Sequence, residues 1–134
     1  MNHSAPIGDL PQSFRDEQRQ LSAEGITTWE ALRSLSDLEL SRMARSGRAT
    51  ARNLKRLRGM ADLVCCLNLA PADAALLMHA GIATVPALAA ATPQVVVTRT
   101  GRLERQLRSS RPPVVDLAVA RRWIAAAQRW QPSN

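Results

Sequence analysis

The sequence contains an internal repeat. Positions 25–28 read Gly-Ile-Thr-Thr and positions 81–84 read Gly-Ile-Ala-Thr, which sets an offset of 56 residues. Leu32 corresponds to Leu88 at the same offset, and the Arg-Ser-Gly-Arg at 45–48 corresponds to the Arg-Thr-Gly-Arg at 99–102 with two residues fewer. A repeat of this length indicates one supersecondary unit used twice. We therefore expect two related units that bury their apolar faces against each other.

The length and composition limit the class of protein. A chain of 134 residues can bury one modest core or two small lobes. It contains no apolar run of 18 residues, so we expect no transmembrane span. The first ten residues combine neither a basic region nor an apolar region of the secretory kind, and the sequence therefore predicts a cytoplasmic protein.

The charge is strongly positive and is carried almost entirely by arginine. The net charge is +7, and all but one of the 18 basic residues are arginine, the exception being Lys55. The guanidinium group is a planar fork of donors that suits phosphate oxygens. Such a balance indicates a polyanionic partner, chiefly nucleic acid. A genome rich in G and C would also favour arginine over lysine, but it would not produce the excess of positive over negative charge.

Capping residues and glycines divide the first unit into helices. Helical periodicity begins near Ser13, and Gly25 is expected to end that helix in a left-handed conformation. Thr28 and Ser36 are expected to cap the next two helices. Gly47 is expected to form a tight turn before a long helix. The predicted helices are 13–24, 29–35, 37–44 and 48–63.

The second unit is expected to repeat this order. Val95 to Val97 read locally as a strand, but the repeat predicts a helix there, beginning at Pro93. Gly101 is expected to form the second tight turn, and the segment 114–130 is expected to be an amphipathic helix with no counterpart in the first unit beyond the tail of its long helix. The prediction is an all-α fold of two tandem repeats plus a C-terminal helix. The expected divisions are a flexible segment 1–12, repeats over 13–64 and 65–111, and the helix and tail over 112–134.

The first unit resembles a helix-hairpin-helix domain, and in particular the C-terminal domain of the bacterial RNA polymerase α subunit. The resemblance rests on Leu-Ser-Ala-Glu-Gly-Ile-Thr-Thr at 21–28, on Leu32, and on Gly-Arg-Ala-Thr at 47–50 followed by Leu54. The tandem arrangement is similar to a bacterial family of duplicated helix-hairpin-helix-like domains that is common in cyanobacteria. The resemblance covers about residues 13 to 109 and implies DNA binding.

The same resemblance implies which positions contact DNA. In the α-subunit domain the contacts come from the first helix and the hairpin, which here correspond to Arg15 or Asp16 with Arg19, and to the segment 47–50. The second unit has Ala72 and Ala75 at the positions in its first helix. The usual glycine-apolar-glycine hairpin has its nearest equivalent in the segment 68–70.

The basic residues are predicted to form two stripes. At 100° per residue, Arg45, Arg48, Arg52, Lys55 and Arg56 fall within a narrow arc of one helix. Amides around Gly47, at a helix N-terminus, would add an anion-binding concavity. A second stripe at near-helical spacing lies beside Gly101. The predicted nucleic-acid-binding residues are Arg45, Gly47, Arg48, Arg52, Lys55, Arg56, Arg99, Gly101, Arg102 and Arg105.

The sequence favours a non-enzymatic protein that binds phosphate backbones with little sequence specificity, DNA more than RNA. No readable nucleophile, carboxylate cluster or Walker loop is present, so we expect no catalytic residue, no metal and no cofactor. Cys65 and Cys66 are expected to be packing thiols. The alternatives are arginines that only solvate helix surfaces, and a protein-interaction adaptor that makes its contact through Trp29, Trp123, Trp130 and the weakly charged second repeat.

Overall fold

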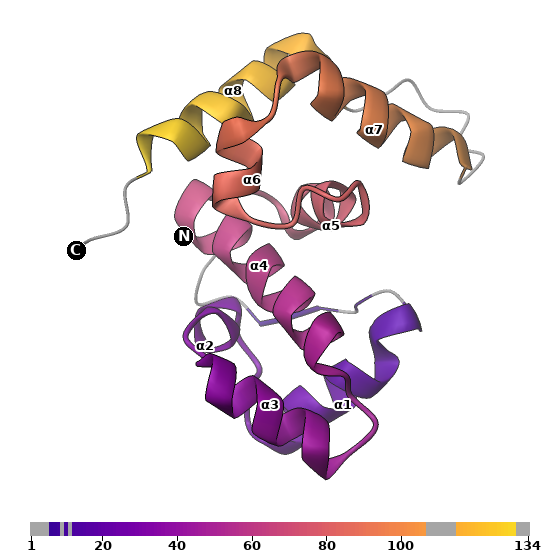
Figure 1. Cartoon of the computed structure of the whole chain (residues 1–134), viewed down its shortest axis with the longest axis vertical. Coiled ribbons are helices and arrows are strands. Elements are labelled where there is room, and N and C mark those ends of the chain that lie inside the picture. Colours follow the sequence, from indigo (N-terminus) through magenta and orange to yellow (C-terminus); the bar gives the residue numbers. More distant parts are fainter. Residues whose placement is uncertain (1–5, 9, 11, 107–114, 131–134) are drawn as a thin grey trace.

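The computed structural model describes residues 6–8, 10, 12–106 and 115–130, and these residues form helices joined by short turns (Figure 1). No named strand occurs in these ranges; an isolated bridge joins Pro6 to Thr28. The all-α class is confirmed. The elements are η1 (Gln12–Phe14), α1 (Arg15–Ala23), α2 (Trp29–Arg33), α3 (Asp37–Ser46), α4 (Ala51–Leu67), α5 (Pro71–His79), α6 (Val85–Ala90), α7 (Pro93–Gln106) and α8 (Leu117–Arg129).

The expected caps begin the helices of both units. The Thr28 hydroxyl accepts a hydrogen bond from the amide of Ala31 at 3.1 Å, and the Thr84 hydroxyl accepts the equivalent bond in the second unit at 3.1 Å. Ser36 and Glu39 form a reciprocal capping box at the start of α3. Gly25 and Gly81 follow α1 and α5 with φ of 77° and 86°, a left-handed conformation that favours glycine. Capping residues and left-handed glycines therefore define equivalent helix boundaries in the two units.

Helix α8 is the counterpart of α4. In the first unit α4 packs on α2 and α3, and in the second unit α8 packs on α6 and α7. The amphipathic C-terminal helix is confirmed, since Ala120, Ile124 and Ala127 are buried along one face of α8. We expected a counterpart only in the tail of the first unit's long helix, whereas the packing pairs α8 with α4 as a whole. Each unit thus consists of four helices in the same order.

Helix α7 departs from the expected second hairpin. The helical prediction for Val95 to Val97 is confirmed, since these residues lie inside α7. The predicted turn at Gly101 is wrong, because α7 continues through this residue to Gln106 and Gly101 is buried within it. The four residues after Gly101 include no Ser, Thr, Asn or Asp that would cap a new helix, whereas Thr50 caps α4 in the first unit. Without a cap, the helix has no local reason to stop.

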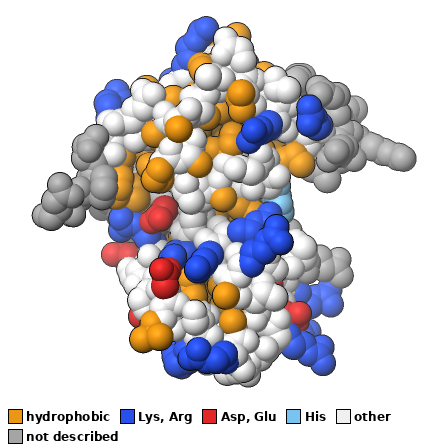
Figure 2. Space-filling view, viewed as in Figure 1, with side chains coloured by type: hydrophobic (Ala, Val, Ile, Leu, Met, Phe, Trp, Pro, Cys, Tyr) orange, Lys and Arg blue, Asp and Glu red, His pale blue; other side chains and the backbone are white. Residues whose placement is uncertain are grey.

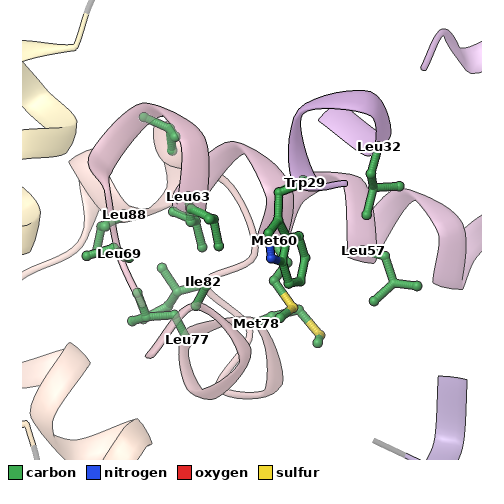
Figure 3. Close-up of a cluster of buried hydrophobic side chains, with 14 of the residues drawn as sticks. Trp29, Leu32, Leu57, Met60, Leu63, Leu69, Leu77, Met78, Ile82 and Leu88 are labelled. Atoms are coloured by element: carbon green, nitrogen blue, oxygen red, sulfur yellow. The ribbon is translucent and has the colours of Figure 1, made fainter. Parts of the chain in front are cut away.

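The long helix α4 carries the core that joins the two units. Figure 3 shows Leu57 of α4 beside Leu32 of the first unit, Met60 between Trp29 of the first unit and Met78 of the second, and Leu63 near Ile82 and Leu88 of the second. These three α4 residues are 0 to 2% exposed. α4 extends past the boundary that we expected between residues 64 and 65, and it also packs on α5, α6 and α8. The two halves of the duplication therefore share one hydrophobic core.

A glycine permits the closest approach between α4 and the second unit. Gly59 is buried in the middle of α4, and a Cβ built on it would overlap the carbonyl oxygen of Ala83. Ala83 lies in the turn between α5 and α6, next to the cap residue Thr84. The absence of a side chain at Gly59 therefore lets the backbone of this turn lie directly on α4.

Candidate nucleic-acid interface

The turn between α3 and α4 carries the first group of predicted binding residues. Arg45 lies in the last turn of α3, Gly47 is its C-cap, and Arg48 lies in the turn; all three are exposed. Because Thr50 caps α4, the helix begins at Ala51 and not at residue 48 as expected. The predicted single helical arc is therefore wrong: Arg45 and Arg48 precede α4, and only Arg52, Lys55 and Arg56 lie on it.

The turn faces the first helix across a basic depression. This depression has a volume of about 290 Å³ and is lined by Ser13, Arg15, Asp16, Arg19 and Arg48. A second depression of about 420 Å³ adjoins it along α1, where Gln20 and Ala23 contribute to the lining. Arg15 and Arg19 were indicated by the resemblance alone, because their distance from the basic run in sequence hides their proximity in space.

Several basic side chains of this region have no ion-pair partner among the described residues. Arg42 donates a hydrogen bond to Glu24 at 2.9 Å, and Arg58 forms an ion pair with Asp37. Hydrogen bonds from Gln20 and Arg42 lower the pKa of Glu24, and the bond from Arg58 lowers the pKa of Asp37. No hydrogen bond or ion pair joins the remaining exposed members to other described residues. These members are Arg45, Arg48, Arg52 and Lys55.

Two amides at the start of α4 already have partners inside the protein. The amide of Thr50 donates to the carboxylate of Glu17 at 2.9 Å, and Glu17 is only 2% exposed. The amide of Asn53 donates to the Thr50 hydroxyl at 3.2 Å. An internal carboxylate therefore already occupies the positive end of α4. On this surface, the hydrogen-bond donors that remain available are arginine side chains more than the backbone amides of this helix N-terminus.

Arg56 differs from the other residues of the first stripe. It is half-buried, and its guanidinium carbon lies 5.3 Å from the centre of the Phe14 ring. The Phe14 ring lies 5.9 Å from the ring of His79, measured between centroids. Burial, and the nearby charge of Arg56, lower the pKa of His79. Arg56 thus lies where the first unit meets α5 and not on the open basic surface.

The second predicted stripe does not form a second hairpin. Arg99 and Arg102 are exposed on α7, whereas Gly101 is buried in the same helix. Arg105 belongs to α7, but its side chain lies outside the described residues. The guanidinium of Arg99 lies beside Gly81, in the turn that ends α5. Figure 2 shows basic side chains gathered over the lower half of the molecule and at its waist, with fewer on the upper half of this face.

The tryptophans do not form an exposed apolar patch. Trp29 is 1% exposed and belongs to the core, which contradicts its expected role as an adaptor contact. Trp123 and Trp130 are half-buried against that core. The guanidinium of Arg33 lies 5.8 Å from the centre of a Trp130 ring and forms an ion pair with Asp62 at 2.9 Å. Burial raises the pKa of Asp62 despite this pairing.

Nearby, Cys65 and Cys66 are partly buried against the core, and burial raises the pKa of both thiols. Within the part of the chain that the structure describes, no group of three or more His, Cys, Asp and Glu residues is placed to hold a metal ion. No described helix is long and apolar enough to cross a membrane.

Fold and surface together define an all-α protein of two four-helix units, with a cationic depression on the first. A family model with the description "Domain of unknown function (DUF4332)" matches residues 11–130, and the chain belongs to this family. No curated protein and no solved structure matches the chain.

Proposed function

We propose that this chain is a non-enzymatic nucleic-acid-binding protein that holds phosphate groups, DNA in preference to RNA, with little sequence specificity. The observation that carries the proposal is the depression between α1 and the α3–α4 turn. Two elements distant in sequence bring Arg15, Arg19 and Arg48 to one place there. Arginine side chains around a shallow surface are suited to phosphate oxygens, which position a protein on nucleic acid without reading its sequence.

The surrounding charges support the same function. Arg45, Arg52 and Lys55 are exposed on the adjoining segments, and none of them forms an ion pair with a described acidic group. Asp16 is the one acidic residue among the described residues that line the depression. The resemblance to helix-hairpin-helix domains, and to the α-subunit domain, supports DNA as the partner, because the corresponding elements of those domains make the contacts. The missing second hairpin and the half-buried Arg56 reduce the proposed surface to the first unit.

The test is a fluorescence-anisotropy titration of the full chain against a labelled duplex of about 30 base pairs and a matched RNA, at about 50 and 200 mM salt. The triple variant Arg19→Ala, Arg48→Ala and Arg52→Ala should bind more weakly at every sequence. The slope of log affinity against log salt should fall by about 0.9 for each phosphate that the variant no longer neutralises.

A matched control removes the same charge from the other end of the molecule. Arg121, Arg122 and Arg129 are exposed on α8, and their replacement by alanine should leave most of the affinity and the salt slope intact. Equal decreases in affinity in the two triple variants would mean that binding follows net charge alone. In that case the depression between α1 and the turn would not be the binding site.

A further inference from the structure

The positions that form the basic depression in the first unit form a different cavity in the second. A cleft of about 670 Å³ lies between the two units. Its lining from α5 consists of Pro71, Ala72, Ala75, Leu76 and His79. At the offset of 56 residues, these correspond to Arg15, Asp16, Arg19, Gln20 and Ala23, which line the two basic depressions. Equivalent faces of α1 and α5 therefore line two different surfaces. The face of α1 is largely charged and polar, whereas the face of α5 is largely apolar.

The rest of the cleft is also apolar. Trp29 and Met60 line it from the first unit, and both are at most 2% exposed, so they form a floor that the core already holds in place. Leu76 and Ala75 are half-buried along α5, and Leu10, also half-buried, contributes from the N-terminal segment. Small-molecule sites are commonly apolar cavities of about 300–1,000 Å³ between structural units. The cleft has this size, composition and position.

One end of the cleft differs from the rest because it carries an ionisable side chain with an arginine nearby. His79 is the one ionisable side chain among the described lining residues. The guanidinium of Arg56 is close enough to His79 to act on it electrostatically, and Phe14 contacts both groups. The position that corresponds to His79 in the first unit is Ala23, so this polar end is specific to the second site. An apolar molecule with a negative group at one end would match both parts of the cleft.

We propose that the cleft between α5 and the first unit binds a small apolar carboxylate. The hydrocarbon part contacts Met60, Trp29 and Leu76, and the carboxylate lies at the His79 end, where Arg56 supplies the opposite charge. This site is separate from the proposed phosphate surface, because the residues that line the cleft are not among those that line the basic depressions. Ligand binding is therefore expected to proceed in variants that no longer bind nucleic acid.

Octanoate and 1-octanol are suitable probes, because they share a chain of the same length and differ in charge. Isothermal titration of the full chain should show saturable one-to-one binding of octanoate and weaker binding of the alcohol. In methionine-methyl NMR spectra the signal of Met60 should shift during the titration. The signal of Met43, which is buried in α3 and does not line the cleft, should stay in place. No heat and no shift at about 1 mM octanoate would overturn the proposal.

Two variants separate the apolar part of the site from its charged end. Ala75→Gln places a larger neutral side chain in the cleft and should weaken octanoate binding by about tenfold or more. Ala118→Gln, at an exposed position of α8, is the matched control and should bind as the unchanged protein does. Arg56→Gln should weaken octanoate by about five- to tenfold and leave 1-octanol unchanged. Equal affinity for the acid and the alcohol in the unchanged protein would overturn the assignment of the charged end.

Discussion

At the scale of single residues, Glu17 connects the first helix to the start of α4. Its carboxylate is buried and accepts the amide hydrogen bond of Thr50. In Glu17→Ala that amide has no partner inside the protein, so the free energy of unfolding should fall by about 1–3 kcal/mol. Urea denaturation would measure the change. Glu30→Ala, at an exposed position of α2, is the control; if both variants are destabilised by the same small amount, Glu17 has no special role.

His79 should make stability depend on pH in a defined direction. Although His79 is exposed on α5, partial desolvation and then Arg56 lower its pKa in the folded chain from 6.5, so the effect on stability should be small because solvent screens an exposed group. The unfolded chain therefore takes up a proton that the folded chain resists, and the stabilising contribution present above pH 6.5 is lost as the pH falls through the folded pKa. Thermal unfolding between about pH 7.5 and 5 should show this decrease in stability. His79→Gln should flatten the profile, and an unchanged profile would contradict the assignment.

Prediction from sequence succeeded where the physics is local to a few residues. Thr28, Ser36 and Thr84 cap helices through their own side chains, and Gly25 and Gly81 adopt the expected left-handed conformation. The grouping of Arg15 and Arg19 with Arg48 depends on how α1 packs beside a distant turn. No spacing along the chain encodes that arrangement. The resemblance suggested two of these residues because it carries tertiary information that periodicity lacks.

At the scale of elements, the comparison of α4 with α7 shows that a capping residue determines whether a new helix begins after the Arg-Ser/Thr-Gly-Arg segment. Similar Arg-Ser-Gly-Arg and Arg-Thr-Gly-Arg segments led us to expect two turns, but only the first is followed by a cap, at Thr50. In α7 the hydroxyl of Thr100 donates to the carbonyl of Val96 at 2.8 Å, and the helix continues. The second stripe of predicted site residues therefore lies along an uninterrupted helix, without a hairpin beside it.

The packing of α4 against the α5–α6 turn gives a prediction for Gly59. In Gly59→Ala the added methyl group would overlap backbone at Ala83, which cannot move as a flexible side chain would. Although alanine favours helices, we expect the free energy of unfolding to fall by about 1–3 kcal/mol, or more if the turn must detach. Arg52→Ala on the exposed face of α4 is the control. A more stable Gly59→Ala would show that the two elements lie farther apart.

At the scale of the whole molecule, duplication has produced two units that are not independent. α4 belongs to the first unit by sequence, yet it packs on α5, α6 and α8 as well as on α2 and α3 (Figure 1). The molecule also carries two surfaces with different chemistry, one lined mainly by arginines and one lined mainly by apolar side chains. A shared core fixes both surfaces in position, which allows each to diverge while the fold is kept.

The shared core predicts a single cooperative unfolding transition. Because α4 packs on helices of both units, with Leu57 beside Leu32 and Leu63 near Leu88, neither unit can unfold without exposing part of α4 to water (Figure 3). Urea unfolding followed by far-ultraviolet circular dichroism should coincide with unfolding followed by tryptophan fluorescence. Trp29 lies in the first unit and Trp123 in α8 of the second, whereas Trp130 lies against Arg33 of the first unit and so reports contact between the two. Two separated transitions would show instead that the units fold independently and that α4 stabilises only one of them.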